Sequence, residues 1–275
     1  MLVLIALAVG KYFLGTHTEV NPVTDEEKRL PWAPAQDVPL GLQAAPQMIR
    51  QHGGEHRDAK LQAFVSQIGN KLVQANAVGD WEPTFRQYRF QFHLLADPET
   101  VNAFALPGGQ VFFTYGLLRR LSINDPEALE NEVAGVLGHE IGHVIGRHSA
   151  RQMAKSDLVN GVIMGIATGM SDGQHDPRQM AAMVANMVNM KYGRDDESQS
   201  DQLGVQFMVN AGYNPEGMIH VMEVLKSLGG GGRQPEFMST HPDPGNRIEH
   251  IRQVIQDVRA GKLEGPKQAE KNLLN

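Results

Sequence analysis

The sequence contains no cysteine among its 275 residues. Disulfide bonds and thiolate metal sites are therefore excluded, and any metal ion must be held by histidine and carboxylate side chains. Basic residues are also in the minority, because 25 Lys and Arg stand against 31 Asp and Glu, for a net charge of -6. Nucleic-acid binding calls for a basic surface, so we predict no nucleic-acid partner.

The apolar segment at the N-terminus is too short for an ordinary membrane-spanning helix. It covers residues 1–14, whereas a span needs roughly 20 apolar residues. We interpret residues 1–15 as a signal segment or an N-terminal anchor, with a buried helix as the alternative. This interpretation predicts the bacterial periplasm, with the chain either soluble after cleavage or attached to the inner membrane. Absence of cysteine fits such an oxidising compartment.

Helical periodicity dominates the rest of the chain. Apolar spacing predicts helices at 42–73 (with a break at Gly53 and Gly54), 126–147, 177–192, 195–211, 215–228 and 246–258. Alternation predicts strands at 88–95, 101–105 and 110–115. We therefore expect an α+β protein that is mainly helical, with a small β-sheet packed before the central helix.

The composition along the chain predicts one folded domain with two less ordered flanks. Residues 16–40 are rich in proline and are predicted to be a linker or a surface strap. The domain is predicted to cover residues 41–260, and residues 261–275 are expected to be a polar tail. An apolar, glycine-containing stretch at 157–170 precedes the methionine-rich helix at 177–192; we expect the pair to cover the cleft or to pack as a hairpin in the core.

The pattern H-E-x-x-H lies within the predicted helix 126–147, at Gly138-His-Glu-Ile-Gly-His143. Residues four apart share a helix face, so the imidazoles of His139 and His143 can reach one zinc ion. Glu140 then lies beside the metal, where its carboxylate can act as general base for water activated by zinc. The alternative is a helix with two satisfied or exposed histidines, but burying them without a metal is costly.

A catalytic zinc site needs a third protein ligand, and the chain offers carboxylates and histidines after the motif. Glu197 and Asp201 lie four residues apart near the start of a predicted helix. Glu197 could bind zinc while Asp201 accepts a hydrogen bond from a ligand imidazole. Acidic residues in a first turn also complement the helix dipole, so the spacing leaves both explanations open. The glycines of the central helix, such as Gly138 and Gly142, predict either close approach of another backbone or plain core packing.

Four motifs together resemble the gluzincin zinc metallopeptidases, the family of HtpX, BepA and the CAAX prenyl endopeptidases. They are Asn102-Ala-Phe-Ala-Leu-Pro-Gly-Gly109, Gly138-His-Glu-Ile-Gly-His143, Tyr192-Gly-Arg-Asp-Asp-Glu-Ser-Gln-Ser-Asp201 and Ser239-Thr-His-Pro-Asp-Pro-Gly-Asn-Arg247. Asn21-Pro-Val-Thr24 and Leu40-Gly-Leu-Gln-Ala-Ala45 are similar to the periplasmic bacterial branch. The match covers most of the chain.

The resemblance implies a zincin-like domain with a small sheet beside the H-E-x-x-H helix. It also implies that Glu197 is the third ligand of one zinc ion per chain. We place Arg194 with Asp201 behind the ligands. The acidic motif often reads Glu-x-Glu-Ala-Asp in this family, whereas Gln199 and Ser200 fill its middle here. Neither is a motif ligand, so we expect no loss of metal.

Two further regions are predicted to act on a substrate. Gln110, Val111, Phe112 and Phe113 belong to a candidate edge strand to which a peptide could add through its backbone; the alternative is a core strand. His241 could stabilise an oxyanion, occupy the open zinc position as a plug, or cap the following helix. Arg247 could pair with carboxylates near the site or on the surface. His148 is predicted to face elsewhere on the helix and to be structural.

These observations predict a zinc-dependent endopeptidase that cleaves unfolded or misassembled envelope proteins. The alternative is a chaperone or assembly factor with a structural zinc site, although a structural site needs no base such as Glu140. A prenyl-protein endopeptidase would need several spanning helices, which the sequence lacks. The expected partners are unfolded or misfolded polypeptides, with possible membrane attachment through the N-terminus. The sequence does not indicate an oligomeric state.

Overall fold

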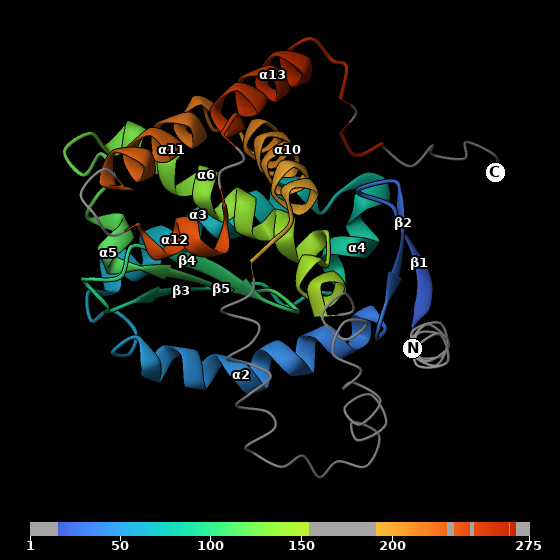
Figure 1. Ribbon diagram of the computed structural model, residues 1–275, viewed down its shortest axis with the longest axis horizontal. Helices are drawn as coiled ribbons and strands as arrows, with labels where there is room; N and C mark the ends of the chain where they lie inside the picture. Colours follow the sequence, from blue (N-terminus) through green and yellow to red (C-terminus); the bar gives the residue numbers. More distant parts are fainter. Residues whose placement is uncertain (1–15, 154–190, 230–233, 243–244, 264, 268–275) are drawn as a thin grey trace, which may run out of the picture.

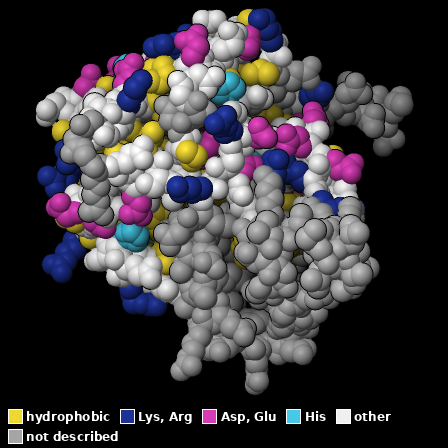
Figure 2. Space-filling model, in the orientation of Figure 1, with side chains coloured by type: hydrophobic (Ala, Val, Ile, Leu, Met, Phe, Trp, Pro, Cys, Tyr) yellow, Lys and Arg dark blue, Asp and Glu magenta, His cyan; other side chains and the backbone are white. Residues whose placement is uncertain are grey.

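The computed structural model describes residues 16–153, 191–229, 234–242, 245–263 and 265–267 (Figure 1). The signal or anchor segment at 1–15, the predicted segments at 157–170 and 177–192 (apart from its last two residues), and most of the tail lie outside the described residues. No described helix combines the length and apolar character that crossing a membrane requires. On the face shown in Figure 2, acidic and basic side chains are interspersed.

Helices form most of the described chain, which confirms the mainly helical α+β class. The long helices are α2 (Asp37–Gln51), α3 (Ala59–Asn76), α6 (Pro126–Ile145), α10 (Arg194–Asn210), α11 (Glu216–Gly229) and α13 (Arg247–Arg259). Shorter helices are α4 (Glu82–Arg86), α5 (Tyr115–Leu118) and α12 (Glu236–Thr240), with 3-10 turns at Pro34–Gln36 and Gly79–Trp81. Helix α6 begins where its sequence predicts, because the Asp125 carboxylate caps it by accepting from the Ala128 N–H at 3.1 Å.

Helix α6 runs through the middle of the molecule (Figure 1). Helices α3, α10 and α11 and strands β4 (Ala103–Leu106) and β5 (Gln110–Thr114) all pack against it. Every α6 residue from Glu132 to Ile145 is buried. Polar side chains in this stretch are therefore removed from water and need partners inside the protein.

The small sheet has the order β3-β5-β4. Strand β3 (Gln91–Leu95) pairs with β5 in parallel, and β4 pairs with β5 in antiparallel fashion across the turn at Pro107 and Gly108. The prediction that residues 110–113 form an edge strand is therefore wrong. Both sides of β5 are already paired, and Gln110, Val111, Phe112 and Phe113 are buried. The outer strands of this sheet are β3 and β4.

Residues 16–30 form a hairpin, β1 (His17–Asn21) and β2 (Glu26–Leu30), where the sequence predicts a linker or strap. The hairpin attaches to the C-terminal end of α6. Asn21 Nδ2 donates to the Ile145 carbonyl at 2.6 Å, and Lys28 Nζ donates to the Gly146 carbonyl at 3.2 Å. Carbonyls at a helix C-terminus lack partners within the helix, so the hairpin completes this end of α6.

Arg147 joins the end of α6 to both the hairpin and α2. It takes a left-handed conformation with φ of 52° and is buried. Its Nε donates to Asp37 Oδ2 at 2.8 Å and its Nη1 to Glu19 Oε2 at 2.6 Å. Its Nη2 donates to the Trp32 carbonyl at 2.8 Å. The chain therefore turns directly after α6, at Gly146 and Arg147, and is held there by a buried charge network.

Helices α6 and α10 approach each other at glycines. A Cβ on Gly138 would lie 3.1 Å from the Gly204 carbonyl oxygen, and one on Gly142 would lie 3.0 Å from Ser200 Cα. Backbone atoms stand where side chains would otherwise separate the helices. Close approach, one of the two explanations left open for these glycines, is therefore confirmed.

We expect the substitution Gly142→Ala to destabilise the fold by about 1–3 kcal/mol, because its methyl group must push α10 away or distort α6. Urea unfolding of purified protein measures this effect. The control is Gly229→Ala at the exposed end of α11, where an added Cβ would meet, among the described residues beyond its own helix, only Gln234 Cγ at 4.0 Å. There the higher helix propensity of alanine should leave stability unchanged or raised. Equal stability of both variants would contradict the close-packing argument.

Candidate metal centre

Four buried side chains bring potential metal ligands together. His139 and His143 come from α6, Glu197 from α10, and His241 from the residue after α12. One ligand atom from each lies within 4.8 Å of the others. His143 Nε2 lies 2.9 Å from His139 Nε2 and 3.4 Å from Glu197 Oε1. The structure therefore brings together residues that are up to 102 positions apart in the chain.

The hydrogen bonding around His139 indicates that this cluster fits a cation. His139 Nδ1 lies 2.8 Å from Asp201 Oδ1. An ionised carboxylate only accepts, so Nδ1 donates and Nε2 is the ring nitrogen that can present a lone pair. That lone pair faces His143 Nε2 and the Glu197 carboxylate, whose Oε2 is 3.6 Å away. Electron-rich groups converging in a buried place call for a divalent ion, and nitrogen and oxygen donors suit zinc.

Glu140 lies beside the cluster without a hydrogen bond. Both of its carboxylate oxygens are buried and lack a hydrogen-bond partner among the described residues. His241 Nε2 lies 3.6 Å from Glu140 Oε1. Burial raises the pKa of Glu140, and the nearby His241 and His139 oppose that rise without cancelling it. A carboxylate with a raised pKa is a stronger proton acceptor, as general-base catalysis requires.

Arg247 of α13 supports the cluster from behind. Its Nε donates to Asp201 Oδ2 at 2.7 Å, its Nη2 to Asp201 Oδ1 at 2.8 Å, and its Nη1 lies 3.0 Å from Glu197 Oε2. Burial alone would raise the pKa of Glu197, but His241 and Arg247 outweigh burial and hold that pKa well below its usual range. Both carboxylates are therefore ionised at neutral pH.

The sequence matches the model of peptidase family M48 over residues 59–255, which include the cluster. The chain belongs to this family. Its metallopeptidase class and its use of zinc agree with the predictions from the sequence, and so does the zincin-like α+β fold.

Known M48 peptidases of bacteria and of mitochondria resemble the chain. It is 35% identical to Metalloprotease YcaL of Escherichia coli (strain K12) over 192 residues, which cover 69% of this chain and 71% of that protein. It is 28% identical to the mitochondrial Metalloendopeptidase OMA1 of Bos taurus over 258 residues, 88% of this chain and 47% of the relative. It is 29% identical to the Beta-barrel assembly-enhancing protease of Escherichia coli (strain K12) over 211 residues, 74% of this chain and 40% of the relative. The chain spans about half the length of several relatives that it matches.

Arg194 does not lie behind the ligands as predicted. It is exposed at the first position of α10. Arg247 lies behind the ligands instead of Arg194. Of the two kinds of pairing predicted for Arg247, the structure shows the one with buried carboxylates near the site. The reason is the direction of the first turn of α10, whose inward face carries Asp196 and Glu197.

His148 contacts the site, although helical periodicity predicts that it faces elsewhere. The helix ends at Ile145 and the chain turns at Arg147, so the periodicity no longer applies. His148 Nδ1 thus lies 2.8 Å from His143 Nδ1. Burial lowers the pKa of His148 to about 4, so its ring is neutral at neutral pH.

Tyr192 is a site residue that the sequence reasoning missed. Its ring stacks on the His143 ring with centroids 3.9 Å apart, and its hydroxyl lies 3.0 Å from Ser149 Oγ. The only signal was its position at the start of the motif that carries Glu197.

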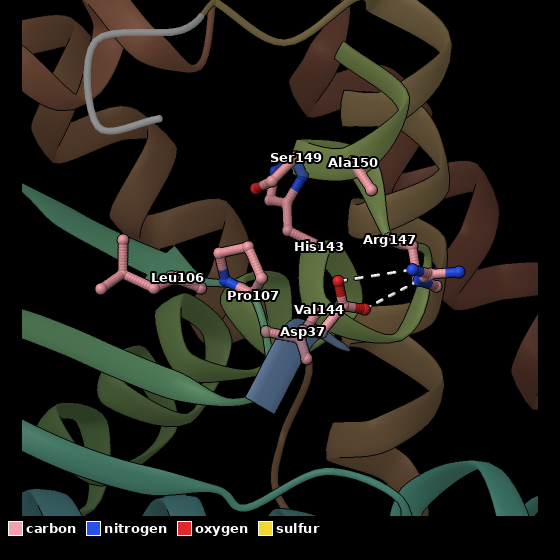
Figure 3. A pocket seen from close by; sticks show the side chains of 9 residues that line it. Asp37, Leu106, Pro107, His143, Val144, Arg147, Ser149 and Ala150 are labelled. Carbon is pink, nitrogen blue, oxygen red and sulfur yellow. Dashed lines mark hydrogen bonds and ion pairs between the residues drawn. The ribbon is translucent and has the colours of Figure 1, made fainter. Parts of the chain in front are cut away.

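A small cavity of about 10 Å³ lies between His143 and the end of strand β4. His143, Leu106 and Pro107 line it, together with the ion pair between Asp37 and Arg147 (Figure 3). Its walls therefore combine one side chain of the metal cluster, the end of β4 and the charge network at the end of α6.

We expect Arg247→Met to lower the free energy of unfolding of chelator-treated M48 protein by about 3 kcal/mol, because it leaves two buried carboxylates without their cation. Urea unfolding is the measurement. Arg252→Met is the matched control, since Arg252 lies on the same helix with half of its side chain exposed and forms only surface ion pairs in the described structure. Its effect should stay within about 0.5 kcal/mol. A loss below 1 kcal/mol in Arg247→Met would contradict the buried network.

Proposed function

We propose that this chain is a zinc-dependent endopeptidase in which His139, His143 and Glu197 hold the metal and Glu140 is the general base. The observation that carries the proposal is the buried convergence of these side chains around lone pairs that need a cation. A buried Glu140 without a hydrogen-bond partner stands at their side. A purely structural zinc site would have no use for such a group.

The chemistry divides between the metal and the protein. Zinc, when bound, supplies Lewis-acid polarisation of the scissile carbonyl and lowers the pKa of water. Glu140 accepts the proton of the attacking water and delivers it to the leaving amine. Asp201 holds the ring of His139 through Nδ1, and Arg247 holds Asp201 and Glu197.

His241 is proposed to block the site in this conformation. Its Nδ1 lies 3.0 Å from Glu197 Oε1 and 3.2 Å from His139 Nε2, inside the ligand cluster rather than across the cleft from it. A plug in this position excludes a substrate carbonyl. The second role left open, stabilisation of the oxyanion, would require His241 to withdraw from this place.

We expect His241→Ala to hydrolyse a short quenched-fluorescent peptide faster than the wild type, because the variant no longer blocks the ligand cluster. The control is His220→Ala on the exposed surface of α11. A fall of 10-fold or more in kcat, at unchanged zinc content, would instead assign His241 to oxyanion stabilisation.

Strand β4 replaces β5 as the proposed peptide-binding strand. It is an outer strand of the sheet, it packs against α6, and its end shares the cavity of Figure 3 with His143. A substrate that adds to β4 would be recognised through its backbone, with little dependence on sequence. Such recognition suits unfolded polypeptides.

The proposed substrates are unfolded or misassembled proteins of the bacterial envelope. The name of one relative, the Beta-barrel assembly-enhancing protease, refers to β-barrel assembly. Mitochondrial relatives share a similar level of identity. We propose a periplasmic location, with residues 1–15 as signal or anchor. We also propose that the peptidase domain covers residues 41–260 together with the N-terminal hairpin at residues 16–30, which packs on the end of α6.

We expect Glu140→Gln to bind zinc as the wild type does and to lose cleavage of unfolded casein by at least 100-fold, because the amide cannot accept the proton. Metal content and casein digestion are measured together, with and without chelator. Glu223→Gln, on the exposed face of α11, is the control. Equal cleavage by Glu140→Gln would defeat the mechanism. Client protection without proteolysis in the wild type would favour the chaperone alternative.

A further inference from the structure

A chain of hydrogen bonds runs from His143 to the N-terminal hairpin. His143 Nδ1 lies 2.8 Å from His148 Nδ1, and His148 Nε2 lies 2.9 Å from Gln199 Oε1. Lys28 Nζ of strand β2 donates to the same Gln199 oxygen at 2.7 Å. His143, His148 and Lys28 are buried, and Gln199 is partly buried.

These hydrogen bonds allow only one assignment of donors and acceptors. The Lys28 ammonium group can only donate, so the Gln199 atom that faces it must be the amide oxygen. That oxygen can only accept, so the hydrogen of the neutral His148 ring is on Nε2. His148 Nδ1 then carries a lone pair and accepts a hydrogen bond from His143 Nδ1. The remaining nitrogen of His143, Nε2, is left with a lone pair directed at the metal cluster.

Two details of the surroundings agree with this direction. The hydroxyl of Ser200 lies 3.3 Å from His148 Nδ1, where it can act as a second donor to the same lone pair. Burial of Lys28 is costly, and it lowers the pKa of the lysine. The Gly146 carbonyl at 3.2 Å and the Glu26 carboxylate at 2.9 Å hold the ammonium group in place. Gln199 and Ser200, the two departures from the family's acidic motif, therefore both face His148.

We propose that Lys28 and Gln199 are positioning residues which, through His148, fix His143 in the one neutral tautomer that can bind metal through Nε2. The inference rests on the proposed metal site. The hairpin then has a task beyond stability, because Lys28 donates to the oxygen of the Gln199 amide and Glu26 accepts from the same amide. Without Lys28, the Gln199 amide keeps only Glu26 of the two hairpin groups that orient it. His148 can then carry its hydrogen on Nδ1, and His143 can be driven to the Nε2–H tautomer.

The experiment measures zinc affinity of the full chain by competition with a chromophoric chelator. We expect Lys28→Met and Gln199→Met to weaken zinc binding by 10- to 100-fold, the range typical for residues that orient a metal ligand. Gln199→Glu should bind zinc more tightly than Gln199→Met, because a carboxylate still accepts from His148 and Lys28, although it also faces Glu26. Lys60→Met, at an exposed position of α3, is the control for loss of a lysine. Circular dichroism and thermal unfolding report on the fold of each variant.

A second measurement needs no substitution. The ring nitrogens of histidine have distinct 15N chemical shifts in each tautomer, so NMR of the zinc-loaded wild type reads the tautomers directly. We expect the hydrogen of His148 on Nε2 and that of His143 on Nδ1. A His148 hydrogen on Nδ1 would overturn the proposal even if the methionine variants failed to fold. Wild-type affinity in all variants, or equal loss in Gln199→Met and Gln199→Glu, would overturn it as well.

Failure of the underlying site looks different from failure of this inference. If the wild type binds no zinc, the proposed metal centre is wrong. If the wild type binds zinc with the His148 tautomer reversed, the metal centre stands and only the role of Lys28 and Gln199 falls.

Discussion

The close contact between α6 and α10 is the constraint on which the site depends. The proposed ligands His139 and His143 project from α6, and Glu197 projects from α10. They meet because Gly138 and Gly142 of α6 let its backbone contact that of α10. Each glycine costs helix stability, about 1 kcal/mol relative to alanine. Packing on all sides of α6 offsets this cost. A separation increased by even one methyl group would move Glu197 away from the imidazoles.

Burial of this contact makes the charges inside it strongly interdependent. Asp201 and Glu197 share the cation of Arg247, and Asp201 in turn orients His139. Glu140 alone among these carboxylates lacks such a partner in the described part of the chain, and burial raises its pKa. The same low-polarity interior thus produces ionised groups suited to bind a metal and one group suited to accept a proton.

The end of α6 connects stability to chemistry. Side chains of the N-terminal hairpin donate hydrogen bonds to its last carbonyls. Arg147, in the turn that follows, donates to Asp37 of α2. The same turn brings His148 to His143. The turn after α6 therefore ends the helix, contacts the hairpin and places the hydrogen-bond acceptor His148 behind the proposed ligand His143.

The sequence by itself determined what is local. Helical periodicity fixed α6, its cap at Asp125, and the spacing of His139, Glu140 and His143, because neighbours on a helix are set by the turn of the backbone. Tertiary structure decided the rest. Three features depend on segments far apart in the chain. They are the central position of β5 in its sheet, the turn at Arg147 that brings His148 inward, and the position of Arg247 rather than Arg194 behind the ligands. Periodicity cannot encode such contacts, because the packing of one element on another selects them.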